Sequence, residues 1–183
     1  MVFFTSDLHF GHDREFIYKS RGFDSVEEMN ESLIFNWNEL IDPEDEIYVL
    51  GDLMMNDISK GAECWKRLKG KKYVILGNHD SNVRIRLYRE LPNTEISGYA
   101  LPYKYMNYNF FLSHYPTITF NYDTDEPLSV QVIDLCGHTH TRDRFSDMDK
   151  GLIYHVEVDA HDNRPVSIDS IIDDIRHYRG IEK

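Results

Sequence analysis

The 183-residue chain has only two cysteines, Cys64 and Cys136, and no long apolar run. The cysteines form no C-x-x-C pair, which argues against a disulfide framework, a thiolate zinc site and cysteine catalysis. No apolar stretch approaches the roughly 18 residues that a membrane helix needs. The N-terminal stretch is interrupted by Asp7 and His9 before it could form the apolar region of a signal peptide. We therefore expect a cytoplasmic protein that does not enter a membrane.

Basic residues are also scarce. The 32 acidic side chains outnumber the 20 basic ones and give a net charge of −12, which argues against general binding to nucleic-acid phosphates or anionic membranes. Residues 22–59 contain 11 acidic side chains and no Lys or Arg, whereas residues 60–90 carry nine basic and three acidic ones. The sequence offers no linker at which to divide the chain. We expect one domain over residues 1–183, in line with the roughly 150-residue size of a common domain.

Five short runs rich in β-branched and aromatic residues predict buried strands. They cover residues 2–4, 47–50, 73–76, 110–112 and 132–136. Between the first two, Ser25 and Glu28 match a capping box, and apolar residues then recur every three to four positions, which predicts a helix. Shorter helices are expected around 57–68 and 82–90, and a last one opens at Ser167. Alternating strands and helices indicate an α/β fold.

The segment from Glu95 to Phe111 is rich in aromatic residues that partly alternate, which predicts two strands joined near Met106 and Asn107. A loop is expected over residues 115–130. The aromatic side chains of this region could pack the strands or stack against a base or an aryl group of a ligand. They are Tyr99, Tyr103, Tyr105, Tyr108, Phe110, Phe111, Tyr115 and Tyr122.

Each of the five apolar runs is followed within about three residues by side chains that can bind a metal ion. In chain order they are Asp7 and His9, Asp52, Asn78 and His79, His114, and His138 and His140. Loops at the carboxyl ends of strands converge in open α/β sheets, so one shared site is expected. Oxygen and imidazole ligands without thiolates suit Mn²⁺, Fe or Zn²⁺, with Ni²⁺ as a further candidate. The set is too large for one tetrahedral ion and indicates two divalent ions.

The order of these polar residues along the chain resembles that of the calcineurin-like metallophosphoesterase superfamily. The small size and the N-terminal sequence are similar to those of its compact bacterial and phage-type members. The family pattern is D-x-H, G-D, G-N-H-[DE], a single His and G-H-x-H. All five occur in order, as Asp7-Leu8-His9, Gly51-Asp52, Gly77-Asn78-His79-Asp80, His114 and Gly137-His138-Thr139-His140. The resemblance implies a four-layer αββα sandwich with a dimetal site at the loops that follow the strands.

The resemblance also implies a role for each matching residue. Asp7, His9 and His140 would hold the first ion, Asn78, His114 and His138 the second, and Asp52 would bridge them. A hydroxide bridging the ions would attack phosphorus in line, and His79 would stabilise the transition state or protonate the leaving group. The expected function is hydrolysis of a small phosphomonoester or phosphodiester. The alternatives are a DNA-repair-type nuclease of the same superfamily and a non-catalytic scaffold of this fold.

Three further residues are candidates for substrate binding. His12 and Arg14 follow the first ligands closely and could reach a phosphate or brace a metal ligand, or they could lie in an exposed loop. Arg84 follows the G-N-H-D loop and could clamp a phosphate, or it could solvate a helix face. Two divalent ions would more than offset the charge of the two predicted aspartate ligands, so the site attracts a small phosphorylated substrate despite the net negative charge.

One departure from the family pattern concerns the partner of His79. Protein serine/threonine phosphatases carry a second Asp that orients this histidine, and here Met55 stands in its place. Asn56 or Asp57 could substitute for it. Three histidines outside the motifs are expected to be structural, namely His155, His161 and His177.

Overall fold

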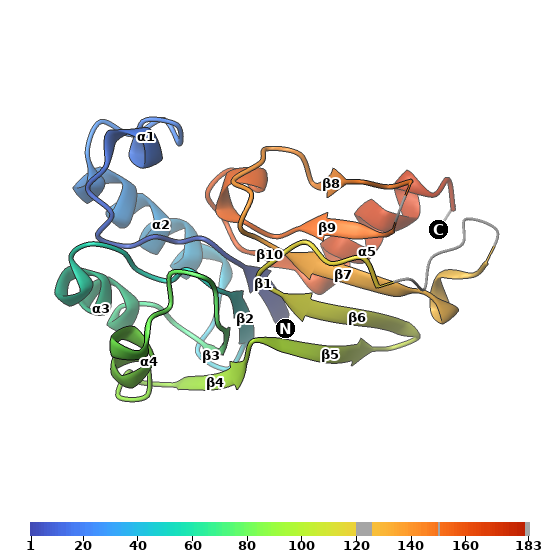
Figure 1. Cartoon of the computed structure of the whole chain (residues 1–183), viewed down its shortest axis with the longest axis horizontal. Coiled ribbons are helices and arrows are strands. Elements are labelled where there is room, and N and C mark those ends of the chain that lie inside the picture. The colour runs from blue at the N-terminus through green and yellow to red at the C-terminus, as the bar shows by residue number, and fades with distance from the viewer. Residues whose placement is uncertain (120–125, 150, 182–183) are drawn as a thin grey trace.

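The protein is described by a computed structural model that covers residues 1–119, 126–149 and 151–181. Within these residues, two sheets of five strands each face one another, with helices beside them (Figure 1). The helical segments are α1 (Glu15–Tyr18), α2 (Val26–Leu40), α3 (Ile58–Lys66), α4 (Asn82–Tyr88), η1 (Leu128–Val130), η2 (Val158–Ala160) and α5 (Ile168–Tyr178). The strands are β1 (Val2–Thr5), β2 (Glu46–Leu50), β3 (Lys71–Ile75), β4 (Thr94–Gly98), β5 (Ala100–Tyr105), β6 (Tyr108–Ser113), β7 (Val132–Cys136), β8 (Phe145–Ser146), β9 (Ile153–His155) and β10 (Val166–Ser167).

The first sheet has the strand order β10-β1-β2-β3-β4, in which β1 to β4 are parallel and β10 runs antiparallel to β1. Successive side chains of a strand point to opposite faces, so this sheet buries two apolar surfaces. Phe3 and Ile47 pack against the helices α2 and α3, whereas Phe4 and Tyr48 pack toward the second sheet. This double burial explains why the strands read as continuous apolar runs.

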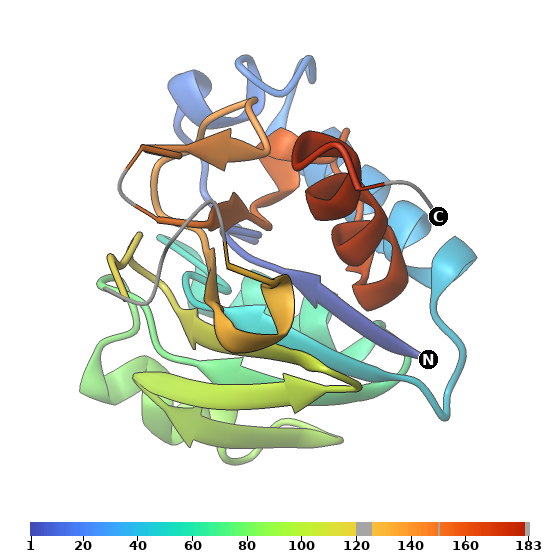
Figure 2. The same cartoon turned by 90° about the vertical axis from the view of Figure 1, so that its right-hand side faces the viewer.

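The second sheet has the order β5-β6-β7-β9-β8, with β6, β7 and β9 parallel and antiparallel strands at both edges. Phe110 and Leu135 face the core between the sheets. Helix α5 packs beside β1 and β10 (Figure 2). Its Ile171 and Ile175 lie in the same core. The carboxyl ends of β1, β2 and β3 thereby lie beside those of β6 and β7.

Local capping signals fix where the long helices begin. Ser25 Oγ accepts a hydrogen bond from the Glu28 backbone N–H at 3.1 Å, and Ser167 Oγ accepts one from the Ser170 N–H at 3.1 Å. Acidic side chains on the outer face of α2 pair with basic side chains of the segment 60–90, as Glu31 does with Arg67. The charge polarisation of the sequence is therefore partly neutralised between α2 and α3.

The structure confirms the α/β sandwich, all five predicted strands and the strand pair joined at Met106 and Asn107. Of the aromatic residues, Phe110 lies in the core between the sheets and Tyr103 packs against it, while Tyr122 lies outside the described residues. Residues 120–125 of the expected loop are likewise outside them, and η1 forms a short turn near its end. Among the described residues, no helix combines the length and apolarity needed to cross a membrane. The single domain and the cytoplasmic location stay predictions.

Candidate metal centre

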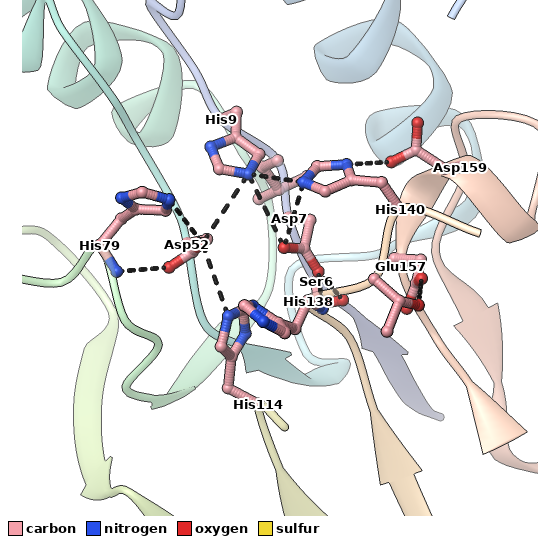
Figure 3. Close-up of polar contacts among 12 residues, drawn as sticks. Ser6, Asp7, His9, Asp52, His79, His114, His138, His140, Glu157 and Asp159 are labelled. Atoms are coloured by element: carbon pink, nitrogen blue, oxygen red, sulfur yellow. Dashed lines mark hydrogen bonds and ion pairs between the residues drawn. The ribbon is translucent and has the colours of Figure 1, made fainter. Parts of the chain in front are cut away.

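The predicted metal ligands converge on one place at the carboxyl ends of the strands (Figure 3). Asp7 and His9 follow β1, Asp52 follows β2, and Asn78 with His79 follows β3. From the second sheet, His114 follows β6, and His138 and His140 follow β7. Two sheets thus supply one site, as the alternation of apolar runs and polar loops predicts.

The first donor group consists of Asp7, His9 and His140. Asp7 Oδ1 lies 3.7 Å from His9 Nε2 and 3.7 Å from His140 Nε2. The two Nε2 atoms are 3.2 Å apart. These three donor atoms therefore surround a single point.

The second donor group adjoins the first through Asp52. Asp52 Oδ2 lies 3.8 Å from His9 Nε2 and 3.5 Å from His114 Nε2, so it stands between the two groups. His114 Nε2 lies 2.7 Å from Asn78 Oδ1. The His138 ring contacts the His114 ring edge-on, with centroids 5.0 Å apart. Asp7 also comes within reach of Asp52 and His114.

The chemistry of the first donor group fits a divalent cation. Asp7 Oδ1 is buried and has no hydrogen-bond partner among the described residues. An unpaired buried carboxylate oxygen is costly unless a cation or a donor faces it. Two imidazole nitrogens point at the same spot, and oxygen with imidazole is the ligand mixture that first-row transition metals accept.

Burial and neighbouring charges set the protonation states that such a cation needs. Burial lowers the pKa of His9 to about 4, so its imidazole is neutral at physiological pH. Burial alone would raise the pKa of Asp7, but its contact with His9 and the nearby histidines outweighs this and holds that pKa well below its usual range. Burial raises the pKa of Asp52 to about 6. Asp7 is ionised and His9 offers a lone pair.

Five of the seven predicted ligands adopt left-handed backbone conformations. The φ angles are 55° for Asp7, 51° for His9, 56° for Asp52, 75° for His138 and 51° for His140. Residues other than glycine avoid this region, and side chains held there cluster at functional sites. The backbone is bent at each ligand so that its side chain turns toward the centre.

Two glycines of the motifs are required by close approach. A Cβ on Gly137 would lie 2.1 Å from Ser6 Oγ and 2.3 Å from Asp7 Oδ2. A Cβ on Gly77 would lie 2.3 Å from Asp52 Oδ1. Each glycine therefore lets one ligand loop pass directly beside the aspartate of another loop.

Residues 1–170 match the model of the Metallophos family, which is described as calcineurin-like phosphoesterase. The chain belongs to this family. It is a hydrolase of phosphoric esters, and the family works with divalent metal ions. The donor groups described above give this phosphoesterase a candidate site for them.

Relatives of this phosphoesterase come from an archaeon and from phages. An uncharacterized protein of Methanocaldococcus jannaschii is 30% identical over 177 residues, which cover 93% of this chain and 89% of the relative. The Gene 66 protein of Mycobacterium phage L5 is 28% identical over 211 residues, with 96% and 94% covered. Among solved structures, a protein of unknown function from Aquifex aeolicus aligns with a TM-score of 0.71 at 24% identity, with 96% and 98% covered. This last likeness shows the shared fold.

Neighbouring groups brace the ligands of the phosphoesterase. Asp7 Oδ2 accepts hydrogen bonds from Ser6 Oγ at 2.6 Å and from the His138 backbone N–H at 2.8 Å. His114 Nδ1 lies 2.8 Å from the Leu50 carbonyl, which directs Nε2 into the site. His140 Nδ1 lies 2.9 Å from Asp159 Oδ2.

His79 stands at the entrance of the site. Its side chain is 40% exposed, and its Nε2 lies 3.9 Å from Asp52 Oδ2. Its backbone N–H donates to Asp52 Oδ1 at 3.0 Å. No described residue hydrogen-bonds to its imidazole. Of the two proposed partners, Asp57 caps α3 and Asn56 bonds to Asp13, so neither orients His79.

The candidates for substrate binding take different places. His12 is buried, and its ring contacts the rings of His9 and Phe16. Arg14 is exposed and precedes α1. Arg84 donates to the His79 carbonyl and contacts Met55 Sδ, so its guanidinium supports the loop that carries His79. Contact with a substrate stays a prediction for all three.

Several residues support the site in roles that the sequence did not predict, including Asp80 of the G-N-H-D motif. Asp80 Oδ2 accepts from the backbone N–H groups of Gly77 and Asp52, and its Oδ1 accepts from Tyr88. Glu157 accepts from Thr139 and from the Thr141 N–H and so holds the G-H-T-H loop. Arg21 and Asp159 stand behind His140. The alternation of His155 and Glu157 with Val156 was an available signal, because alternate residues of an extended segment share a face, whereas Asp159 lies in η2.

Two of the three histidines that were expected to be structural have such contacts. His155 bonds to Ser146 and Glu157, and His161 bonds to the His155 carbonyl. His177 lies in the last turn of α5, away from the ligands.

Proposed function

We propose that this phosphoesterase binds two divalent transition-metal ions in the adjoining donor groups and hydrolyses a small phosphomonoester or phosphodiester. In this proposal the first ion is bound by Asp7, His9 and His140, and the second by Asn78, His114 and His138. Both ions are bound by Asp52. The observation that carries the proposal is the position of Asp52 Oδ2, 3.8 Å from His9 Nε2 and 3.5 Å from His114 Nε2.

Such ions lower the pKa of water and neutralise charge that develops on phosphoryl oxygens. We infer Mn²⁺ as the native ion, and the ligand mixture also suits Fe, Zn²⁺ or Ni²⁺. Carboxylates from two loops and imidazoles from three fix where a phosphate oxygen could bind. Side chains of the protein position the substrate and transfer the proton.

His79 is suited to deliver that proton to the leaving oxygen. Its imidazole is partly exposed at the entrance, and among the described residues it has no hydrogen-bond partner that would occupy its nitrogens. Its backbone is nevertheless fixed by Asp52 on one side and by Arg84 on the other. A general acid needs this combination of a fixed position and a free donor atom.

The substrate is expected to be small. With a net charge of −12, the protein repels long polyanions, whose binding depends on many Lys and Arg contacts to phosphates. A single phosphate group needs only the local positive charge of the two ions. Long nucleic acids and membranes are therefore not proposed as partners.

The test is hydrolysis by the metal-stripped full chain after loading with Mn²⁺, Ni²⁺ or Zn²⁺. An aryl phosphate and an aryl phosphodiester serve as probes, with single-stranded DNA as a third substrate. We expect hydrolysis of at least one aryl probe, loss of it on chelation, and a fall of about a thousandfold in Asp52→Asn, in keeping with several kcal/mol of metal-assisted stabilisation. Asp24→Asn, at an exposed ion pair with Lys19, is the matched control and keeps full activity.

Failure to hydrolyse both aryl probes with every ion across pH, in a folded protein, contradicts the proposal. Cleavage of DNA in preference to the aryl probes, lost in His79→Ala, favours the nuclease instead. A folded chain that binds no ion favours the non-catalytic scaffold.

A further inference from the structure

A buried ion pair lies directly behind the first donor group. Arg21, between α1 and α2, donates from Nε and Nη2 to Asp159 Oδ1 and Oδ2 of η2, at 3.0 and 2.8 Å. The side chains are 1% and 10% exposed. A fork of two hydrogen bonds away from water fixes the relative orientation of both groups.

The guanidinium of Arg21 also holds the turn that carries Asp7 and His9. Its Nη2 donates to the Asp7 carbonyl at 2.7 Å, and its Nη1 donates to the Leu8 carbonyl at 3.2 Å. Asp7 and His9 both have left-handed backbone angles, which the chain avoids unless its surroundings stabilise them. Arg21 satisfies the two carbonyls of this strained turn where no water reaches them.

The carboxylate of Asp159 holds the other side of the donor group. Its Oδ2 lies 2.9 Å from His140 Nδ1, and Figure 3 shows it on the far side of the His140 ring from His9. An ionised carboxylate can only accept, so His140 Nδ1 carries the proton and Nε2 offers its lone pair. That lone pair faces Asp7 Oδ1 and His9 Nε2.

We propose that Arg21 and Asp159 act as one positioning unit, which sets the tautomer of His140 and its distance from Asp7 and His9 and thereby how tightly the first ion binds. The unit joins the turn after β1 of the first sheet to η2, which follows β9 of the second sheet. The proposal rests on the two-ion function proposed above.

The experiment measures metal binding itself. Mn²⁺ is titrated calorimetrically into the metal-stripped full chain of the wild type, Asp159→Asn, Arg21→Lys and the double variant. Losing a carboxylate that orients a ligating histidine weakens metal binding by about 10–100-fold. We expect this loss for one of the two ions in each single variant, with little further loss in the double variant. Asp174→Asn, which breaks the Arg144 ion pair away from the site, is the control and binds as the wild type.

Unchanged binding in both single variants overturns the positioning unit while leaving the two-ion function intact. Additive losses in the double variant overturn the claim that the pair acts as one. A wild type that binds no Mn²⁺ overturns the two-ion function as well. A second measurement uses the metal-free wild type, so a folding defect of a variant cannot affect it. Long-range ¹H–¹⁵N NMR reports the His140 tautomer. A neutral His140 ring with its proton on Nδ1 supports the proposal, and a neutral ring with its proton on Nε2 contradicts it.

Discussion

The two donor groups of this phosphoesterase differ in how firmly their ligands are held. In the first, Asp7 accepts two hydrogen bonds and His140 is fixed by a buried carboxylate. In the second, His114 is fixed by a backbone carbonyl, but the His138 ring contacts only other rings among the described residues. His79 has a partly exposed imidazole whose Nε2 lies 3.9 Å from Asp52 Oδ2, the carboxylate between the two groups.

This difference indicates a division of labour within one site. In the proposed two-ion function, a firmly held group keeps its ion in place through the reaction, because it loses little order when the substrate binds. A less constrained group can adjust to a phosphate and its leaving group. Substitution of His79, which is partly exposed and is not a predicted ligand, should therefore change catalysis more than metal binding.

The largest effect that would sharpen this comparison is expected from His79→Ala. Loss of a positioned general acid lowers kcat by about 10²- to 10⁴-fold, while both ions stay bound. Steady-state hydrolysis of an aryl phosphate and elemental analysis of the same sample measure the two quantities. His177→Ala, in the last turn of α5, should match the wild type in both. Loss of an ion in His79→Ala would remove the distinction between the two roles.

A second prediction concerns the backbone beneath Asp52. Asp80→Ala removes three hydrogen bonds and leaves buried N–H groups unpaired, so the free energy of unfolding should fall by about 3 kcal/mol. Tyr88→Phe removes one of these bonds and should cost about 1 kcal/mol. Urea unfolding of the metal-free proteins measures both. Equal losses in the two variants would show that Asp80 supports α4 rather than the ligand loops.

A third prediction uses the acid sensitivity of the firmly held group. Burial would raise the pKa of Asp159, but its hydrogen bonds with His140 and Arg21 outweigh this and lower it to about 2. A depressed carboxylate pKa stabilises the fold fully above the unfolded value of about 4, and this stabilisation is lost as the pH falls toward 2. The difference in unfolding free energy between the wild type and Asp159→Asn should therefore shrink by about 1 kcal/mol from pH 5 to pH 3. Denaturant unfolding at both pH values tests this, and a constant difference would contradict it.

The smallest effect is expected from Tyr115, an exposed ring against His138 with centroids 4.6 Å apart. Stacking of an aryl leaving group on this ring predicts that Tyr115→Ala raises KM for an aryl phosphate about threefold to tenfold, with kcat little changed. KM for an alkyl phosphate should not move. Tyr99→Ala, at an exposed tyrosine between β4 and β5, is the control. A parallel rise in both KM values would point to a structural role for Tyr115.

The sequence predicts the features of this molecule that local patterns encode. Ser25 and Ser167 mark helix starts through their neighbours, and the apolar runs before Asp52 and His114 place these residues at strand ends. Arg21 and Asp159 could not be paired in this way, because 138 positions separate them and no local pattern connects them. The two-residue strands β8 and β10 could not be predicted for a similar reason, since they form only by pairing with β9 and β1.

The left-handed turns at the ligands carry a consequence for the evolution and engineering of this fold. Each costs on the order of 1 kcal/mol relative to a glycine at the same position, and five of them add up to much of the margin by which a small protein is stable. Selection for thermal stability alone would replace these aspartates and histidines with glycine. A variant library screened only for heat resistance would therefore drift toward chains that fold well and have lost the ability to cleave phosphate esters.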